Sequence, residues 1–420
     1  MEGKVNFEDL NVEYGESVNN PGSLFLYNDE ENEFRLKMRQ WAKENILPVD
    51  AEIERVGNVD LNTAFNMCVD IYKKMAKDGL LSLAFPTSIG GGGKGFVYRV
   101  ISGEELAAIN SAVVVTYGAS ANLFCAPIIH FGTEEQKKKY LIPVGIKGEK
   151  LGAIAITEPT AGSDAVGGMR TTAIKKGDKY IINGEKRFIT NGSKADYLLL
   201  YALTNPDAPR KHQGISAFIF PTDTPGFEAV RDYELCGRKG SINSHLIFNN
   251  CEVSEENLVG GPDMENKGIR IMMSGLDGER CFTCSQYLGI ARSAFEVAFK
   301  YANKRRQFDK FLREFEGISF RISNMYAKLE AGRLMMLRAA RMLDAGLRAT
   351  KEVAAAKFMC ADYQMEICLD AVQICGGVGY TKDFPVERYF RDAKIGQISA
   401  GTTDILRFLC QRELYREIKE

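Results

Sequence analysis

Two short segments of the chain, residues 155–164 (AITEPTAGSD) and 186–192 (KRFITNG), carry side chains suited to binding a flat, polar ligand. Each segment alternates hydroxyl or glycine positions with apolar ones, a pattern typical of extended backbone that lies against a ligand. Gly162 lets a large group approach the backbone, and Phe188 supplies a ring that can stack. Hydroxyl groups come from Thr157, Ser163 and Thr190. The two segments therefore predict a binding site for a planar cofactor.

The overall composition is that of a globular protein without preference for a charged partner. The chain has 420 residues, of which 45% are hydrophobic and 26% are charged, and its formal net charge is -1. A chain of this length usually forms more than one packed unit. Because the charge is nearly balanced, the basic footprint of a protein that binds nucleic acid or an anionic membrane is missing, and neither partner is expected.

Membrane and export signals are not expected either. Apolar runs such as residues 197–203 are far shorter than a membrane-spanning helix, and residues 1–10 show neither an apolar signal region nor a transit-peptide composition. These observations favour a cytoplasmic location.

The cysteines and histidines do not suggest a metal site. The 10 cysteines are scattered, mostly through apolar stretches, which predicts buried free thiols rather than disulfides. Cys281 and Cys284 form one C-x-x-C pair, but no second pair accompanies it and the chain has only 3 histidines. We therefore expect no bound metal.

The periodicity of apolar residues changes twice along the chain, which predicts three domains. Residues 1–150 and residues 263–420 repeat with the period of helices, whereas residues 151–262 alternate with the period of strands. Asn183–Gly184 lies between two β-rich runs and predicts a hairpin turn. The expected fold is multidomain α+β, with an N-terminal helical domain, a middle antiparallel β-domain and a C-terminal four-helix bundle.

Six motifs together point to one family. They are AITEPTAGSD, KRFITNG, KRRQF (304–308), QICGGVGY (373–380), RDAKIGQI (391–398) and AGTTDI (400–405). In this order and spacing, the chain resembles the acyl-CoA dehydrogenase family from about residue 28 to its end. Residues 112–123 and 274–280 are most similar to the isovaleryl-CoA dehydrogenase type. The resemblance implies the same three domains, FAD between the last two, an acyl-CoA substrate, a homotetramer and electron transfer to an electron-transferring flavoprotein.

The resemblance also assigns cofactor contacts to individual residues. The flavin ring and pyrophosphate would be lined by Ile156, Thr157, Gly162 and Ser163. Phe188, where many members have Trp, and Thr190 would cover the other side of the flavin. The FAD phosphates and adenosine would be held across a subunit boundary by Arg305, Gln307, Phe308, Gln373 and Gly377. Thr402 and Asp404 would complete the pocket.

The catalytic base has an unusual position under this resemblance. Many members carry a carboxylate immediately before the Gly-Thr of the last loop, where this chain has Ala400. Isovaleryl-type members place the base before the Arg of a D-x-E-R stretch, which matches Glu279 here. Removal of the α-proton of a thioester needs such a carboxylate. A purely structural alternative is that Asp277 caps a helix and Glu279 interacts with the helix dipole.

The remaining substrate contacts follow from the same resemblance. The thioester carbonyl would lie at Ala400 and Gly401, polarised by the Ala400 N–H and a flavin hydroxyl, and CoA would contact Ser163, Asp277 and Arg280. Small residues at Ser399 and Ala400 leave room for branched, alicyclic or aryl acyl groups. Residues 110–120 contain no cation, which argues against glutarate but leaves other dicarboxylates open. An oxidase, a dehydrogenase acting at a remote ring position and a non-catalytic acyl-CoA-binding flavoprotein are the alternatives.

Overall fold

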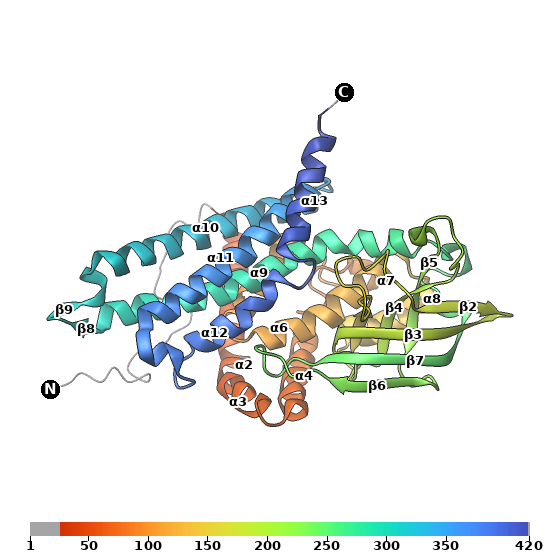
Figure 1. Cartoon of the computed structure of the whole chain (residues 1–420), viewed down its shortest axis with the longest axis horizontal. Coiled ribbons are helices and arrows are strands. Elements are labelled where there is room, and N and C mark those ends of the chain that lie inside the picture. The colour runs from red at the N-terminus through yellow and green to blue at the C-terminus, as the bar shows by residue number, and fades with distance from the viewer. Residues whose placement is uncertain (1–25, 419–420) are drawn as a thin grey trace.

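The computed structural model describes residues 26–418 and shows two helical regions with a β-sheet packed at one end (Figure 1). The N-terminal region is helical, as expected. Its elements are α2 (Asp29–Asn45), α3 (Leu47–Gly57), α4 (Leu61–Lys77), η2 (Thr87–Ile89), α5 (Phe96–Ala107), α6 (Ser111–Tyr117), η3 (Gly118–Phe124), α7 (Cys125–Phe131), α8 (Glu134–Gln136) and η4 (Lys137–Ile146). Side-chain caps start several of these helices, because Asn28, Asp60 and Asn110 each accept hydrogen bonds from backbone N–H groups of the first turn.

The stretch Ser111–Phe131 is a longer apolar segment than the sequence analysis predicted. It runs through α6, η3 and α7 and is long and apolar enough to span a membrane by those two criteria, so the expectation that all apolar runs are short was wrong. Burial explains the composition, since 78% of its most apolar window lies inside the folded protein. The stretch is therefore a core helix of the N-terminal region.

The middle region folds as a 7-stranded sheet. Its strands are β1 (Gly152–Ala155), β2 (Thr172–Lys176), β3 (Lys179–Thr190), β4 (Tyr197–Leu203), β5 (Ile215–Pro221), β6 (Phe227–Asp232) and β7 (Asn243–Ser254), with η5 (Lys211–Gln213), η6 (Glu255–Asn257) and η7 (Pro262–Met264) between or after them. The order is β1-β4-β2-β3-β7-β6, and β5 pairs with β4. The strands are not all antiparallel, because β1 and β2 pair with β4 in parallel.

The predicted hairpin at Asn183–Gly184 was wrong. Both residues lie inside the long strand β3, where the pairing with β7 shifts register between Ile182 and Gly184. The turn between β2 and β3 is instead at Gly177, whose φ of +67° suits glycine. Gly184 is required for a different reason, since a Cβ there would lie 2.6 Å from the Thr171 Cα. The Asn-Gly pair therefore marks a β-bulge and not a turn.

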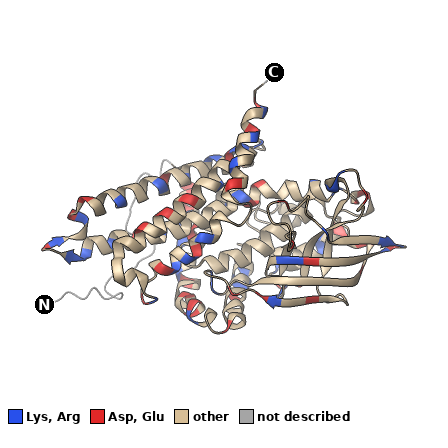
Figure 2. Cartoon of the chain, viewed as in Figure 1, with Lys and Arg blue, Asp and Glu red and all other residues tan. Residues whose placement is uncertain are grey.

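The C-terminal region is helical again. It contains α9 (Gly268–Lys304), the hairpin β8 (Arg306–Gln307) and β9 (Lys310–Phe311), η8 (Leu312–Glu314), α10 (Glu316–Asp344), α11 (Thr350–Cys375), η9 (Gly376–Tyr380), α12 (Val386–Ala393), η10 (Lys394–Gln397) and α13 (Thr403–Arg416). Three long helices, α9, α10 and α11, pack side by side, and α13 packs on α11 and then projects outward (Figure 1). Basic and acidic residues are interspersed along the helices and strands (Figure 2).

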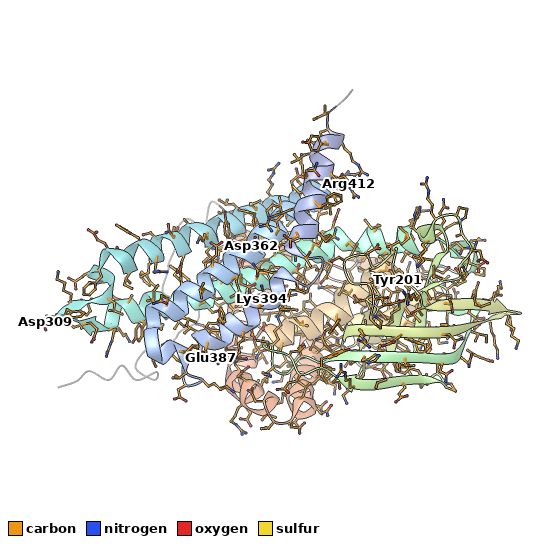
Figure 3. All side chains as sticks on the ribbon, in the orientation of Figure 1. Tyr201, Asp309, Asp362, Glu387, Lys394 and Arg412 are labelled. Atoms are coloured by element: carbon orange, nitrogen blue, oxygen red, sulfur yellow. The ribbon has the colours of Figure 1, made fainter. Side chains whose placement is uncertain are left out.

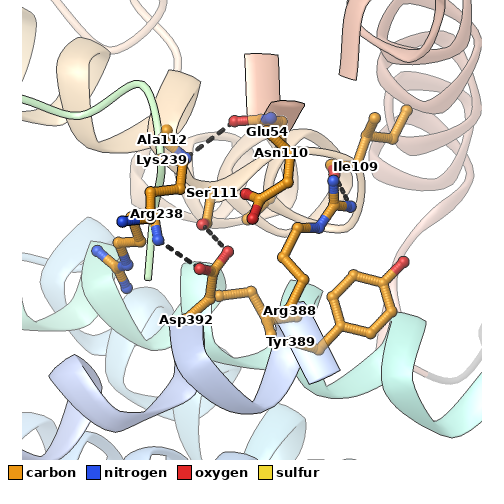
Figure 4. A pocket seen from close by; sticks show the side chains of 12 residues that line it. Glu54, Ile109, Asn110, Ser111, Ala112, Arg238, Lys239, Arg388, Tyr389 and Asp392 are labelled. Carbon is orange, nitrogen blue, oxygen red and sulfur yellow. Dashed lines mark hydrogen bonds between the residues drawn. The ribbon is translucent and has the colours of Figure 1, made fainter. Parts of the chain in front are cut away.

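The three regions meet at a small polar pocket (Figure 4). Asp392 of α12 accepts a hydrogen bond of 2.7 Å from the Ser111 hydroxyl and a further one from the Arg238 backbone N–H. Arg388 of the same helix pairs with buried Asp50 at 3.0 Å. Helix α12 thus binds the N-terminal region and a loop of the β-domain through the same face.

Buried cysteines are free, as predicted. Eight of the cysteines are buried, Cys410 is partly buried and Cys236 is exposed, and all are free thiols. Within residues 26–418, no group of three or more His, Cys, Asp or Glu side chains is placed to hold a metal ion.

Candidate active site

The two predicted ligand-binding segments lie next to each other. Strand β1 leads into the first segment and β3 carries the second, and the Arg187 N–H donates a hydrogen bond of 2.8 Å to the Thr157 carbonyl. The fully buried Lys186 ammonium donates to the Ile156 carbonyl at 3.0 Å and to Glu158 at 2.8 Å. These bonds fix one segment against the other.

Glu158 and Lys186 form a closed ion pair that the sequence reading missed. The Glu158 carboxylate also accepts hydrogen bonds from the backbone N–H groups of Arg170 and Thr171, at 2.7 and 3.0 Å. Burial opposes ionisation of Glu158, but Lys186 and these donors outweigh it and hold the pKa of the carboxyl below its ordinary value. Both residues stand inside the two motifs, yet nothing in their spacing indicates that they pair.

Phe188 is presented by an irregular backbone. The pairing of β3 with β7 shifts register between Lys186 and Ile189, and Phe188 has a φ of 57°, which is unfavourable for a bulky residue. Its ring is 58% exposed and contacts Tyr233 at a centroid distance of 4.8 Å. The bulge therefore turns an aromatic face outward, where a planar ligand can stack on it.

The approach to the first segment is open. A Cβ at Gly162 would meet no atom of the described residues within 4 Å, and Gly162 and Ser163 are both exposed. Ile156 and Thr157 are partly buried at the end of β1, and the Thr190 hydroxyl donates to Asn243 at 3.2 Å. Of the predicted residues of the middle domain, Gly162, Ser163 and Phe188 are thus exposed, and their contact with a cofactor stays a prediction.

Glu279 lies on the helical side of the site and is 8% exposed. Its carboxylate Oε2 has no hydrogen-bond partner among the described residues, and the nearest cation is the Arg99 guanidinium at 3.9 Å. Burial raises the pKa of Glu279 to about 8, and Arg99 opposes this rise only in part. A carboxyl group with such a pKa can accept and release a proton near neutral pH.

The structural alternative for Asp277 and Glu279 was wrong. Helix α9 begins at Gly268 with Lys267 as its N-cap, so both acids lie well inside the helix and away from its dipole end. Asp277 instead accepts a hydrogen bond of 2.6 Å from the Thr350 hydroxyl on α11. Glu279 therefore has Arg99, at 3.9 Å and outside hydrogen-bond distance, as its charged partner among the described residues.

Arg280 connects the helix that carries Glu279 to the loop of residues 399–402. Its Nε donates to the Ala400 carbonyl at 3.3 Å, and its guanidinium lies 3.7 Å from Asp277. Of the two predicted CoA contacts, Arg280 is thus engaged in holding this loop, and Asp277 is bonded to Thr350. Ala400 is thereby placed beside the turn of α9 that presents Glu279.

The loop itself has a fixed, unusual shape. Ala400 and Gly401 both have positive φ, 55° and 93°, and Thr402 caps α13 by accepting the Ile405 N–H at 3.2 Å. The buried Lys357 ammonium donates to the Gly401 carbonyl at 2.6 Å and to the Gly396 carbonyl at 2.9 Å. Lys357 is a second positioning residue that the sequence reading missed, because it lies on α11, far from the loop in the chain.

The predicted adenosine contacts lie elsewhere in this chain. Arg305, Gln307 and Phe308 form the β8–β9 hairpin, where Phe308 is 89% exposed. The hairpin, marked by Asp309, lies at the opposite end of the molecule from the sheet that contains Tyr201 (Figure 3). Gln373, Gly377 and Asp404 are also exposed. The hairpin therefore cannot join the Phe188 site within one chain.

Comparison with known proteins agrees with this arrangement. The family models for the N-terminal, middle and C-terminal domains of acyl-CoA dehydrogenase match residues 28–148, 153–251 and 266–415. The chain belongs to the acyl-CoA dehydrogenase family. It is 42% identical to an acyl-CoA dehydrogenase of Bacillus subtilis over 90% of this chain and 96% of that protein. It is 36% identical to a mitochondrial isovaleryl-CoA dehydrogenase of Solanum tuberosum, over 93% and 92% of the two chains.

Solved structures of this acyl-CoA dehydrogenase fold superpose closely. The butyryl-CoA dehydrogenase of Megasphaera elsdenii has a TM-score of 0.86 at 35% identity, covering 93% of this chain and 99% of that one. A structure described as an electron-transferring flavoprotein of Acidaminococcus fermentans contains a chain with a TM-score of 0.86 at 38% identity, with the same two coverages, 93% and 99%. The three-domain expectation for the fold is confirmed.

FAD is the cofactor of this acyl-CoA dehydrogenase, and the residues present fit it. The exposed Phe188 ring offers a stacking surface for a flavin, and the open backbone at Gly162 admits a pyrophosphate. The protein is an oxidoreductase of the acyl-CoA dehydrogenase family.

Proposed function

We propose that this protein dehydrogenates an acyl-CoA thioester between its α and β carbons, with Glu279 as the base. The observation that carries the proposal is a buried carboxylate without a hydrogen-bond partner among the described residues, held beside the loop of Ala400. The proton of the α-carbon moves to a Glu279 oxygen, and the bound flavin supplies the hydride acceptor for the β-hydrogen.

The loop of residues 399–402 positions the thioester. In this proposal the Ala400 N–H donates to the thioester carbonyl, which gains negative charge as the α-proton leaves. Arg280 and Lys357 hold the two carbonyls of this loop, so the donor keeps its direction. In this proposal Gly401 and Ser163 also contact the substrate, and Asp277 and Arg280 can additionally face CoA.

The cofactor site is shared between subunits in this proposal. Ile156, Thr157, Gly162, Ser163, Phe188 and Thr190 contact the flavin and pyrophosphate, while Thr402 and Asp404 close the pocket. The exposed β8–β9 hairpin, with Arg305, Gln307 and Phe308, reaches the FAD of a neighbouring subunit together with Gln373 and Gly377. The separation of this hairpin from the β-sheet in one chain supports a contribution from a second subunit, and the homotetramer stays a prediction. The domain boundaries at 150 and 262 and the cytoplasmic location stay predictions.

Branched, alicyclic or aryl acyl groups are the proposed substrates. Ser399 and Ala400 are small, so the loop leaves space beside the reactive carbons that a glutamate at position 400 would fill. The likeness to isovaleryl-CoA dehydrogenases supports a branched chain. The chain in the electron-transferring flavoprotein structure supports that class of protein as electron acceptor.

Anaerobic reduction of the flavin tests this function. The holoenzyme is mixed with branched, straight, cyclic and aryl acyl-CoA esters, and loss of the oxidised-flavin absorbance is followed with and without an electron-transferring flavoprotein. Glu279→Gln should slow bleaching by at least about 10²-fold while FAD stays bound. Reduction by the variant at the wild-type rate would refute Glu279 as base. Rapid reoxidation by oxygen but not by the flavoprotein would identify an oxidase.

A further inference from the structure

Arg99 is a buried cation that no anion among the described residues meets at hydrogen-bond distance. It lies on α5, is 8% exposed, and its guanidinium lies over the rings of Phe96 and Phe282 at 5.4 and 5.3 Å. Its Nε has no hydrogen-bond partner among the described residues. Since a guanidinium has five N–H donors, a buried one normally binds a carboxylate or several carbonyls.

Glu279 is the nearest acid, but the two groups do not form a closed pair. The distance from the Arg99 guanidinium nitrogen to Glu279 Oε2 is 3.9 Å, which is too long for a hydrogen bond. Two other buried arginines meet their acids closely, since Arg292 reaches Glu105 at 2.8 Å and Arg388 reaches Asp50 at 3.0 Å, whereas buried Arg238 likewise leaves Nε and Nη2 without a partner among the described residues. Arg99 is thus held near Glu279 without being neutralised by a hydrogen-bonded contact.

Other buried polar atoms that lack a hydrogen-bond partner among the described residues lie near Tyr117. Buried atoms without a hydrogen-bond partner in the described part of the chain include Thr116 Oγ1, Asn122 Nδ2 and Asn191 Oδ1. Asn191 donates to the Thr116 carbonyl at 3.1 Å, and Tyr117 interacts electrostatically with both Arg99 and Glu279. Buried polar atoms in native proteins are mostly paired, so a group of unpaired ones points to a polar ligand.

We propose that Arg99 binds a carboxylate carried by the acyl group, so that the substrates are CoA monothioesters of short, branched dicarboxylic acids. This inference rests on the proposed function, because Glu279 must contact the α-carbon for its neighbour Arg99 to reach the acyl chain. A carboxylate that accepts two guanidinium N–H bonds would satisfy the unpaired donors.

The position of Arg99 also limits the length of the acid. Its guanidinium lies within 3.9 Å of the carboxylate that removes the α-proton, so the second carboxylate must be only a few bonds from the α-carbon. That geometry favours succinate-like acids over longer ones. The absence of a cation from residues 110–120 is consistent with this, because here the cation comes from the preceding helix, α5.

A pair of matched esters tests the inference. In 2-methylsuccinyl-CoA, with CoA on the carboxyl next to the branch, a carboxylate replaces the terminal methyl group of 2-methylbutanoyl-CoA. Anaerobic flavin bleaching gives kcat/KM for each ester with wild-type holoenzyme, Arg99→Met, Arg99→Lys and the exposed control Arg210→Met. The wild type and the control should prefer the dicarboxylic ester. Arg99→Met should lower the ratio of the two constants by about 10- to 100-fold, and Arg99→Lys by less.

The outcomes separate this inference from the proposed function. A wild type that prefers 2-methylbutanoyl-CoA, or an Arg99→Met variant that slows both esters equally, would overturn the carboxylate site while Glu279 remains the base. Failure of both esters to bleach the flavin, with FAD bound, would overturn this inference, and the proposed function would fall as well only if the straight, cyclic and aryl esters also left the flavin oxidised. Because the wild-type ratio is itself informative, the test does not depend on the folding of the variant.

Discussion

Two buried glutamates of this protein each lie near a cation, but only one of them is hydrogen-bonded to it. In the β-domain, Glu158 lies 2.8 Å from Lys186 and accepts two backbone hydrogen bonds, and the pKa of its carboxyl is lowered. On the helical side, Glu279 lies 3.9 Å from Arg99 and burial raises its pKa to about 8. Burial is similar, with 4% and 8% of each glutamate exposed. Satisfied hydrogen bonds therefore distinguish a structural carboxylate from one available for proton transfer.

Replacement of the two glutamates should have opposite consequences. Glu279→Gln should lower the rate of flavin reduction by about 10²- to 10⁴-fold and leave folding intact, because no hydrogen bond among the described residues is lost. Glu158→Gln should leave reduction measurable in the fraction that folds but lower stability. Stopped-flow bleaching and urea unfolding measure the two effects. The comparison fails if Glu158→Gln loses as much rate as Glu279→Gln at full FAD occupancy.

Breaking the closed pair tests its structural role directly. Lys186→Met leaves the buried Glu158 charge unpaired and should lower the free energy of unfolding by about 3–5 kcal/mol. The double variant Glu158→Gln/Lys186→Met should recover much of this loss. Lys179→Met, which removes an exposed pair with Glu252 at 3.2 Å, is the control and should cost less than about 1 kcal/mol. Equal losses of unfolding free energy in Lys186→Met and Lys179→Met would contradict a structural role for the Glu158–Lys186 pair.

The pair of Glu279 and Arg99, which is not hydrogen-bonded, should be visible in the dependence of the free energy of unfolding on pH. The folded protein keeps a proton on Glu279 up to about pH 8, whereas the unfolded chain releases it near the ordinary value of 4.5. Stability from this group is full below that lower value and is lost as pH rises through the folded pKa. Between about pH 5 and pH 9, the free energy of unfolding of the wild type should fall by on the order of a few kcal/mol relative to that of Glu279→Gln. Parallel pH profiles for the two holoproteins would show that Glu279 is not buried as described.

The smallest effect is expected at the aromatic face of the β-domain. Phe188→Ala removes an exposed ring, so it should weaken FAD retention by about 0.5–1.5 kcal/mol without destabilising the fold. Phe188→Trp should retain FAD at least as well, because its larger ring offers more stacking area. Dissociation of FAD during dilution, followed by flavin fluorescence, measures both variants. An unchanged dissociation constant in Phe188→Ala would remove Phe188 from the flavin site.

Local patterns in the sequence predicted the domains and the meeting of the two motifs, since each depends on periodicity and short-range spacing. Strand β3, in contrast, continues through Asn183–Gly184, because pairing with β7 outweighs the turn preference of those two residues. The predictions for Glu279 and the flavin contacts came from the resemblance, and the role of Glu279 stays a prediction.

Other parts of the site could not be predicted from local patterns. Arg99, Lys357 and the Glu158–Lys186 pair act through contacts between segments distant in the chain. Helical periodicity indicates which face of α5 is buried, but not that Arg99 on that face meets Glu279 on α9. Such information lies in the packing of helices and not in any one segment.

Asp392 has a consequence for how the protein unfolds. One carboxylate of α12 accepts hydrogen bonds from Ser111 in the first region and from the Arg238 backbone in the second. Detaching any one of the three regions would remove at least one hydrogen bond that this carboxylate accepts from another region. We therefore expect the chain to melt in a single calorimetric transition, and fragments cut at the domain boundaries to lack cooperative unfolding.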